Sequence, residues 1–346
     1  MPGFREKMIS AGFTAFGATG IHRLAAPLTR GLGAILMFHH VRPRVERDFA
    51  PNRLLEITPQ FLDAALTRVT ARGFDLVSLD AALERIKAPG ERPFVVLSFD
   101  DGYRDNVAHA LPILEKHAAP FTMFVTSGFA DRSARLWWVE LGEAIRRLDR
   151  VALDEVAFSA SNSAEKERAH AILYRTLRAG PEERLLEVCA RLCAEAGINP
   201  ADIPREFCLD WPGITQLSQH PLATIGAHTL THPMLAKHPE SLVRRELAES
   251  RTRIEQAIGR PARHLAYPVG DPTSAGPREF AIAHELGFTS AVTTRPGMVF
   301  PEHAANLTAL PRLSVNGRYQ SLEMLDILLS GAPFALWNKG RRVNAA

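Results

Sequence analysis

Two neighbouring carboxylates follow an apolar run near position 100. Residues 94–99 (FVVLSF) lead directly into Asp100, Asp101 and Gly102. An apolar run that ends in charged residues is typical of a buried strand whose carboxyl end opens into a polar site. Because adjacent side chains of an extended chain point in opposite directions, each aspartate can take a separate task. One can bind a metal ion while the other handles a proton.

Two histidines follow a second apolar run, residues 222–227. His228 and His232 are four positions apart, a spacing that predicts one face of a helical turn and two rings that converge on one cation. Together with Asp101 they would make a set of two imidazoles and one carboxylate, which leaves positions open for water and substrate. Zinc is the metal we expect for this set, and cobalt, nickel or iron would also suit it.

These two segments resemble motifs of the polysaccharide deacetylase family, the NodB-like enzymes of carbohydrate esterase family 4. Residues 98–102 (SFDDG) look like the family's first motif, and residues 228–232 (HTLTH) resemble its metal-binding H-[ST]-x-x-H motif. The resemblance implies that Asp100 is the general base and that Asp101 and the two histidines hold the metal. It also implies hydrolysis of an N-acetyl group on a sugar, so the expected partner is an N-acetylated glycan.

Amide hydrolysis also needs a proton for the departing amine, and histidine is the usual donor near neutral pH. Many family members place this histidine after a C-terminal strand, but the present chain has no histidine after Arg312. Instead, His39 and His40 follow an apolar run near the N-terminus. This order looks like that of members in which circular permutation has moved the last strand to the front. By this resemblance His39 is the acid candidate, with His40 second because a loop can turn either ring inward.

The third motif of the family, often Arg-x-Pro-aromatic-Gly, corresponds here to residues 266–271 (AYPVGD). Ala266 stands at the arginine position and Val269 at the aromatic one. The backbone N–H of Val269 can still serve the oxyanion, since that role needs no particular side chain. Tyr103 and Tyr267 are further candidates for contact with the substrate or the oxyanion.

Arg312 stands inside an apolar stretch near the C-terminus. An arginine inside a buried strand needs a carboxylate partner, because an unpaired buried charge is costly. A pair with Asp100 would replace the arginine that the third motif lacks. The sequence therefore favours Arg312 as a catalytic candidate beside Asp100 and His39.

The elements that must position these residues alternate between strands and helices. Strands are expected at 34–38, 74–77, 94–99, 121–125, 223–227, 264–267, 288–292 and 312–315. Helices are expected at 58–72, 78–86, 106–117, 239–258 and 277–286. This alternation predicts an α/β fold with a mostly parallel sheet or barrel and a site at the carboxyl ends of the strands. The family resemblance makes it a distorted (β/α)7-type barrel, the glycoside hydrolase–deacetylase barrel.

An N-terminal extension, a C-terminal tail and an internal insertion depart from this alternation. We expect a helical extension at 1–33, the barrel at 34–330 and a tail at 331–346, with a helical insertion at 131–215 rich in arginine, glutamate and leucine. Trp137 and Trp138 in the insertion are either platforms that stack on sugars or buried packing residues. Residues 8–28 are amphipathic, so they either pack against the barrel or lie on a membrane surface.

Composition narrows the class of protein. A net charge of +3 over 346 residues, without a basic stripe that carries interleaved aromatics, argues against a nucleic-acid partner. No apolar run is long enough to span a bilayer, and the first thirty residues make a poor secretory signal. A cytoplasmic or membrane-peripheral location is therefore favoured. The sequence does not indicate the oligomeric state.

Together these features predict a metal-dependent carbohydrate de-N-acetylase. Two alternatives stay open: hydrolysis of another non-peptide C–N bond on the same fold, and a catalytically inactive sugar-binding module. The complete set of Asp100, Asp101, His228 and His232 argues against the inactive module.

Overall fold

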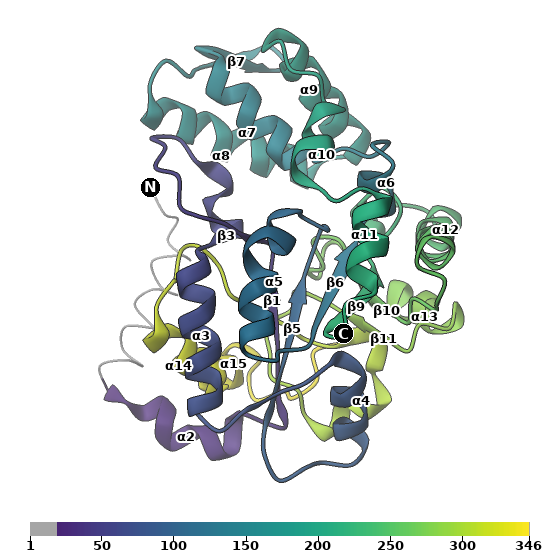
Figure 1. Cartoon of the computed structure of the whole chain (residues 1–346). Coiled ribbons are helices and arrows are strands. Elements are labelled where there is room, and N and C mark those ends of the chain that lie inside the picture. The colour runs from purple at the N-terminus through teal and green to yellow at the C-terminus, as the bar shows by residue number, and fades with distance from the viewer. Residues whose placement is uncertain (1–18, 346) are drawn as a thin grey trace.

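Seven parallel strands form the central sheet, which curls into a half-barrel (Figure 1). The structure is a computed structural model and describes residues 19–345. The order across the sheet is β11 (Ser290–Val292), β10 (His264–Ala266), β9 (Ala223–Ala227), β6 (Phe121–Val125), β5 (Phe94–Phe99), β1 (Gly33–Phe38) and β12 (Leu313–Ser314). An additional strand, β4 (Asp75–Leu76), pairs with the first half of β5. The predicted α/β barrel-type fold is confirmed in this form.

Side chains of the central strands alternate between two apolar clusters, as the two-residue period of a strand requires. In β1, Leu36 and Phe38 pack with the helices outside the sheet, whereas Ile35 belongs to a cluster on the other side. All six residues of β1 and all six of β5 are buried. A strand buried on both faces has a continuous apolar sequence, which is the pattern that made these strands easy to predict.

Helices cover the outside of the sheet. They are α3 (Pro59–Ala71), α5 (Leu111–Lys116), α11 (Trp211–Ser218), α12 (Glu240–Ile258), α13 (Pro277–Glu285) and α14 (Leu322–Leu329). Helix α4 (Leu79–Lys87) packs instead against the cluster on the other side, which contains Ile35. Thr58 and Ser78 cap α3 and α4 by accepting hydrogen bonds from backbone N–H groups of the first turn. The predicted helix 106–117 begins with a π-helical turn, η2 (Asn106–Ala110), and continues as α5.

Short elements complete the barrel region. They are β2 (His40–Val41), β3 (Glu56–Ile57) and the 3-10 turns η1 (Pro51–Leu55), η3 (Leu235–Lys237), η4 (Pro301–Ala305) and η5 (Leu307–Ala309). The parallel pair of β2 with β3 continues the chain just beyond the carboxyl end of β1. It therefore fixes the path of the chain that leaves the sheet at His39.

Residues 131–215 contain most of the helices that do not cover the sheet, and these lie above it in Figure 1. They are α7 (Trp137–Arg147), α8 (Ser163–Ala179), α9 (Glu182–Glu195) and α10 (Asp202–Phe207), preceded by α6 (Ser127–Ala130). These helices share an apolar cluster of their own. An antiparallel hairpin, β7 (Arg150–Leu153) with β8 (Val156–Ser159), was not predicted. The domain boundaries stay predictions.

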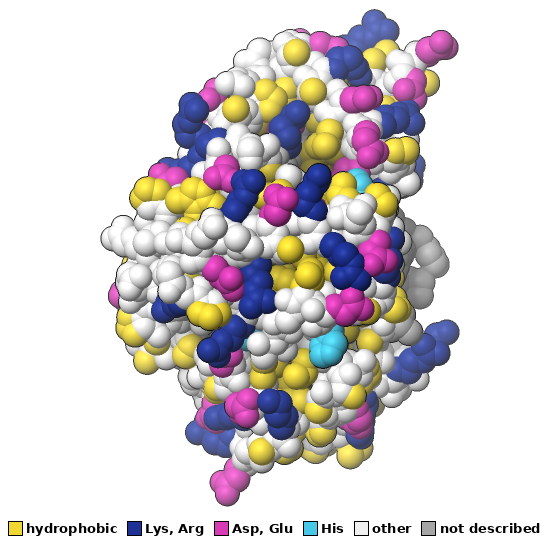
Figure 2. All heavy atoms as spheres, turned by 90° about the vertical axis from the view of Figure 1, so that its right-hand side faces the viewer, with side chains coloured by type: hydrophobic (Ala, Val, Ile, Leu, Met, Phe, Trp, Pro, Cys, Tyr) yellow, Lys and Arg dark blue, Asp and Glu magenta, His cyan; other side chains and the backbone are white. Residues whose placement is uncertain are grey.

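Helices close to the two ends of the described chain pack against each other. Helix α2 (Ile21–Thr29) packs against α14 and α15 (Ala332–Trp337). Of the predicted amphipathic stretch, residues 8–18 lie outside the described residues, and α2 covers most of the rest. Within residues 19–345, no helix combines the length and apolar character needed to span a membrane. Figure 2 shows acidic and basic side chains interspersed over one face.

The sheet register places the predicted site residues at one level. Phe38 of β1 pairs with Phe99 of β5, so His39 and Asp100 leave the sheet side by side. Val125 of β6 pairs with Ala227 of β9, and the N–H of His228 donates to the Val125 carbonyl at 2.9 Å. The candidate residues therefore gather at the carboxyl ends of neighbouring parallel strands.

Candidate active site

Asp101, His228 and His232 meet at the carboxyl ends of β5 and β9. Each offers one ligand atom, and the three atoms lie within 4.8 Å of one another. Asp101 Oδ1 is 3.5 Å from His228 Nε2 and 3.4 Å from His232 Nε2. All three side chains are buried, and Asp101 Oδ1 has no hydrogen-bond partner. The sequence-predicted ligand set is thus brought together, with an unpartnered carboxylate oxygen at its centre.

This donor set fits a divalent metal ion. Ligand atoms about 2.0–2.2 Å from a tetrahedral zinc lie about 3.3–3.6 Å from each other, close to the separations found here. His228 Nδ1 bonds to the Ala266 carbonyl at 2.7 Å, which leaves Nε2 as the unprotonated nitrogen that faces Asp101. Burial opposes ionisation of Asp101, but the two imidazoles hold the pKa of its carboxyl well below its usual range. The carboxylate is therefore in its ligating form.

The loop that carries the two histidines is irregular, so the predicted helical turn is wrong. Thr229 and His232 both have φ of 64°, in the left-handed region that a right-handed helix excludes. Asp101 and Val269 share this conformation, with φ of 70° and 59°. Such backbone strain persists only where surrounding contacts impose it, and it gathers at functional sites. The two imidazole rings converge because Thr229 and His232 adopt this left-handed conformation, and not because of helical periodicity.

Helix α12 imposes that loop conformation. Glu246 Oε2 accepts hydrogen bonds from the N–H groups of Leu230 and Thr231 at 2.9 and 2.8 Å, and its Oε1 accepts from Thr231 Oγ1 at 2.8 Å. One turn later, Ser250 Oγ donates to the Thr229 carbonyl at 2.8 Å. Both side chains are buried, and Glu246 forms no ion pair within the described chain. Sequence reasoning missed both residues, because a glutamate on a long helix gives no local signal of this role.

Asp100 forms a bidentate ion pair with Arg312. Both guanidinium nitrogens donate to the carboxylate oxygens at 2.7 Å, and Arg312 Nε donates to the Thr293 carbonyl at 2.9 Å. The pair suggested by the sequence is present, and both side chains are buried. Burial disfavours the carboxylate, yet Arg312, with a contribution from His228, lowers the pKa of Asp100. Asp100 is therefore ionised and able to accept a proton.

His39 and His40 have different surroundings. His40 Nδ1 bonds to Asp105 Oδ2 at 2.6 Å, and its ring stacks on Tyr103 with centroids 3.6 Å apart. His39 is half-buried beside the two aspartates: burial lowers its pKa, while the charges of Asp101 and Asp100 act to raise it. The structure thus fixes His40 in a pair with Asp105, while the charges of Asp100 and Asp101 act on His39. Asp105 was another residue that sequence reasoning missed.

Val269, Tyr103 and Tyr267, the three candidates for contact with the substrate or oxyanion, differ in exposure and in hydrogen bonding. Val269 is half-buried, and its N–H donates to no acceptor among residues 19–345. Tyr103 is fully buried beneath His40, and its hydroxyl accepts from Trp138 Nε1 at 3.2 Å. Tyr267 is also fully buried, and its hydroxyl donates to the Thr308 carbonyl at 2.8 Å. Val269 therefore presents a free backbone donor, whereas the Tyr103 hydroxyl is enclosed and Tyr267 belongs to the barrel core.

The helical insertion closes one side of the site. The Trp138 ring lies 4.7 Å from that of His232, centroid to centroid, but only 7% of Trp138 is exposed. Glu182 of α9 accepts a hydrogen bond at 3.0 Å from the N–H of Met234, just after the loop that carries His228 and His232. Trp137 is buried within the insertion. Both tryptophans therefore pack, and neither offers an open platform for a sugar.

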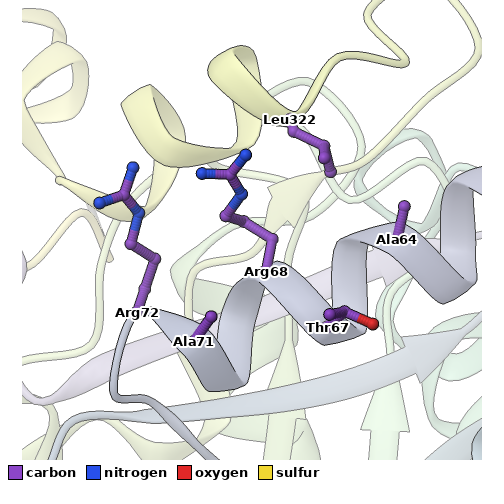
Figure 3. Close-up of a pocket in the computed structure, with 6 residues that line it drawn as sticks. All are labelled: Ala64, Thr67, Arg68, Ala71, Arg72 and Leu322. Atoms are coloured by element: carbon purple, nitrogen blue, oxygen red, sulfur yellow. The ribbon is translucent and has the colours of Figure 1, made fainter.

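A separate pocket lies between α3 and α14, away from these residues (Figure 3). It has a volume of about 360 Å³, and Arg68 and Arg72 project along it. Both arginines pair with Asp326, which neutralises part of their charge. The pocket contains none of the residues that could do chemistry on an amide.

Comparisons with known proteins support one family. The family model described as polysaccharide deacetylase matches residues 87–291, more than half of the chain. A comparison of this chain with curated protein sequences found no match.

Solved structures share the fold at low identity. Streptococcus pyogenes deacetylase PplD in complex with acetate is 18% identical, with a TM-score of 0.57 over 84% of this chain and 95% of that one. IcaB from Ammonifex degensii is 18% identical, with a TM-score of 0.54 over 86% and 96%. A de-N-acetylase from Aggregatibacter actinomycetemcomitans is 14% identical, with a TM-score of 0.53 over 85% and 98%.

Proposed function

Because the chain belongs to the polysaccharide deacetylase family, we propose that it is a metal-dependent hydrolase that removes N-acetyl groups from a glycan containing amino sugars. One observation carries the proposal: the ligand atoms of Asp101, His228 and His232 meet within 4.8 Å beside the paired Asp100. Zinc is the metal that we expect in this site, and cobalt, nickel or iron would suit the same donors.

A divalent ion held by Asp101, His228 and His232 would polarise the acetyl carbonyl and lower the pKa of a bound water. Asp100 then acts as the general base, because Arg312 keeps its carboxylate ionised. The bidentate contact also fixes the orientation of the carboxylate, so the base is in place before substrate arrives.

Two further groups complete the proposed reaction. The free N–H of Val269 donates to the oxyanion of the tetrahedral intermediate, aided by a backbone that its neighbours hold in the left-handed region. His39 donates the proton to the departing amine, since it lies close enough to Asp100 and Asp101 for their charges to act on it, while His40 is held by Asp105. Acetate and a free amino sugar are the expected products. The similar S. pyogenes deacetylase was solved with acetate, which agrees with this product.

The proposal is tested by metal analysis combined with acetate release. The purified protein is expected to hold about one divalent ion per chain and to release acetate from an N-acetylated oligosaccharide. Stoichiometric metal without acetate release would favour hydrolysis of another non-peptide C–N bond. Absence of both metal and turnover would favour an inactive sugar-binding module and would contradict the proposal.

A further inference from the structure

Helix α2 presents an apolar stripe to solvent. Ile21, Leu24 and Leu28 are 54%, 82% and 81% exposed. At about 100° per residue, these three positions fall within a sector of about 60° on the helix surface. Single exposed leucines are ordinary on a protein surface, but an aligned set on one helix marks an interaction face. We call these three residues the α2 stripe.

The opposite side of α2 is seated on the body of the protein. His22 is buried, and Thr29 Oγ1 donates to the Ser330 carbonyl at 2.6 Å. The helix packs against α14 and α15, and Leu336 of α15 is itself 71% exposed. The α2 stripe is therefore held outward by contacts on the other side of the helix.

The chain segments that carry α2 and α15 contain basic but no acidic residues, and the nearest acidic residue beside Arg30 is Glu91 of another loop. Residues 19–45 and 331–346 contain no aspartate or glutamate. Arg23 of α2 and Arg30, which follows its last residue, lie on one side of the stripe, about 100–120° from Leu24 around the helix axis. Neither arginine pairs with a carboxylate within residues 19–345, and the same holds for Lys339 and Arg341. Long basic side chains at the edge of an apolar stripe can reach a headgroup layer while the leucines enter the acyl boundary.

We propose that the α2 stripe docks on an anionic membrane surface. Aligned leucines with arginines along one edge are the arrangement of a helix that lies in a bilayer interface, where apolar burial and attraction to anionic lipids act together. A second copy of this chain is a poorer partner, because the basic residues of two α2 helices would repel each other. The proposal does not depend on the deacetylation proposed above.

Docking in this way leaves the candidate active site open. Helix α2 precedes the amino end of β1, whereas His39 follows its carboxyl end. A strand of six residues spans roughly 20 Å, so the site would lie at about that height above the lipid. Figure 1 shows α2 at the end of the molecule opposite to the helical insertion. A glycan chain could therefore reach the site while the protein stays on the membrane.

The experiment compares binding to vesicles of phosphatidylcholine alone with binding to vesicles that also contain phosphatidylglycerol. The test variant is Leu24→Glu with Leu28→Glu, and the matched control is Val156→Glu on β8, where an apolar side chain is 57% exposed far from α2. Wild type and control are expected to sediment with the anionic vesicles. The double variant is expected to lose at least about tenfold in partitioning, and neutral vesicles are expected to bind all three weakly.

Four outcomes would overturn the proposal. They are no vesicle binding by the wild type, equal binding by the double variant, a dimer that the double substitution dissolves, and a Tm that falls in the double variant but not in the control. The third would assign the stripe to contact between copies, and the fourth to packing within the chain itself. Acetate release from a soluble oligosaccharide is measured in parallel and should be equal in all three proteins. Failure of docking is thereby distinguished from failure of the proposed reaction.

Discussion

At the residue scale, the position of an arginine keeps Asp100, the proposed general base, ionised. Where the third motif of the family often has an arginine, this chain has Ala266, and the guanidinium comes instead from Arg312 beside β12. It holds both oxygens of Asp100 and donates to Thr293 as well. Arg312 therefore keeps the Asp100 carboxylate ionised and oriented from a different part of the sheet than the third motif.

Replacing Arg312 with Met should reduce turnover far more than metal content. Without the guanidinium, the buried Asp100 carboxylate has no cationic partner, so its pKa rises and the base is protonated in a larger fraction of molecules. Breaking a buried pair also costs about 3–5 kcal/mol of stability. Acetate release and metal content are measured together on folded protein. The control is Arg295→Met, another buried arginine, which donates to the Ala275 carbonyl. Unchanged turnover would remove Arg312 from the mechanism.

Substitution of the two adjacent aspartates should separate their roles. Asp100→Asn is expected to keep the metal and lose activity, since an amide cannot accept the proton from water. Asp101→Asn is expected to lose metal affinity as well, because it replaces the anionic ligand between the two imidazoles. Metal content and acetate release of both variants are the measurements. Normal metal binding in both would show that this division of roles is wrong.

Glu246 should control metal affinity without touching the metal. In Glu246→Gln, the amide can place an NH₂ group against the N–H groups of Leu230 and Thr231, so the loop loses part of its support. Partners of this kind typically alter metal affinity by about 10–100-fold. Titration with zinc against a competing chelator measures the effect. Glu249→Gln, one turn nearer the C-terminus on an exposed part of α12, is the control. If Glu246→Gln and Glu249→Gln bind zinc with equal affinity, Glu246 does not support the loop that carries His228 and His232.

The residue types of the site could be predicted from the sequence, but its loop geometry could not. Asp100, Asp101, His228 and His232 each follow an apolar strand, and that local pattern is visible in the chain. The convergence of the histidines depends on two left-handed residues held by Glu246 and Ser250. A spacing of four residues suggests a helix, because spacing carries no information about a contact supplied by another element.

At the scale of elements, the strands could be predicted where burial on both faces makes them uniformly apolar, as in β5 and β6. The elements of the insertion were harder to predict from the sequence. The helical insertion expected at 131–215 contains two separate long helices, α8 and α9, which are divided at Gly180 and Pro181. The hairpin β7–β8 turns at Asp154, which has φ of 53°. Its second strand is largely exposed, so it lacks the apolar alternation that indicates a strand.

The insertion should lose stability in mild acid through His170 of α8. Burial lowers the pKa of His170 to about 4, and its Nε2 has no hydrogen-bond partner. The unfolded state, with a pKa near 6.5, binds the proton more readily, so this contribution is complete above about pH 6.5 and is lost as the pH falls towards 4. The loss amounts to at most about 3 kcal/mol. Denaturant unfolding from pH 7 to 4.5 measures it. His170→Phe, which keeps the aromatic contact with Phe49, should flatten this slope, and an unchanged slope would contradict the assignment.

The arrangement of the whole molecule depends on pairings between distant segments. The sheet places β1 between β5 and β12, which brings positions near 39, 100 and 312 together. Local sequence predicts that each strand exists, but not its neighbours, because parallel strands need no short connection between them. The family resemblance supplied what the residues alone could not, namely the barrel and the N-terminal position of the acid candidate.

Removal of metal should destabilise the whole fold. Asp101 and the two histidines come from β5 and β9, which β6 separates in the sheet, so an ion between them links strands more than 120 residues apart in the chain. A ligand at one hundred times its Kd stabilises the folded state by about 2.7 kcal/mol. A chelator should therefore lower Tm by roughly 3–6 °C, measured by thermal unfolding with and without added zinc. Asp101→Asn should show almost no response to either reagent. A wild-type Tm that is equally indifferent would mean that these three side chains hold no ion in solution.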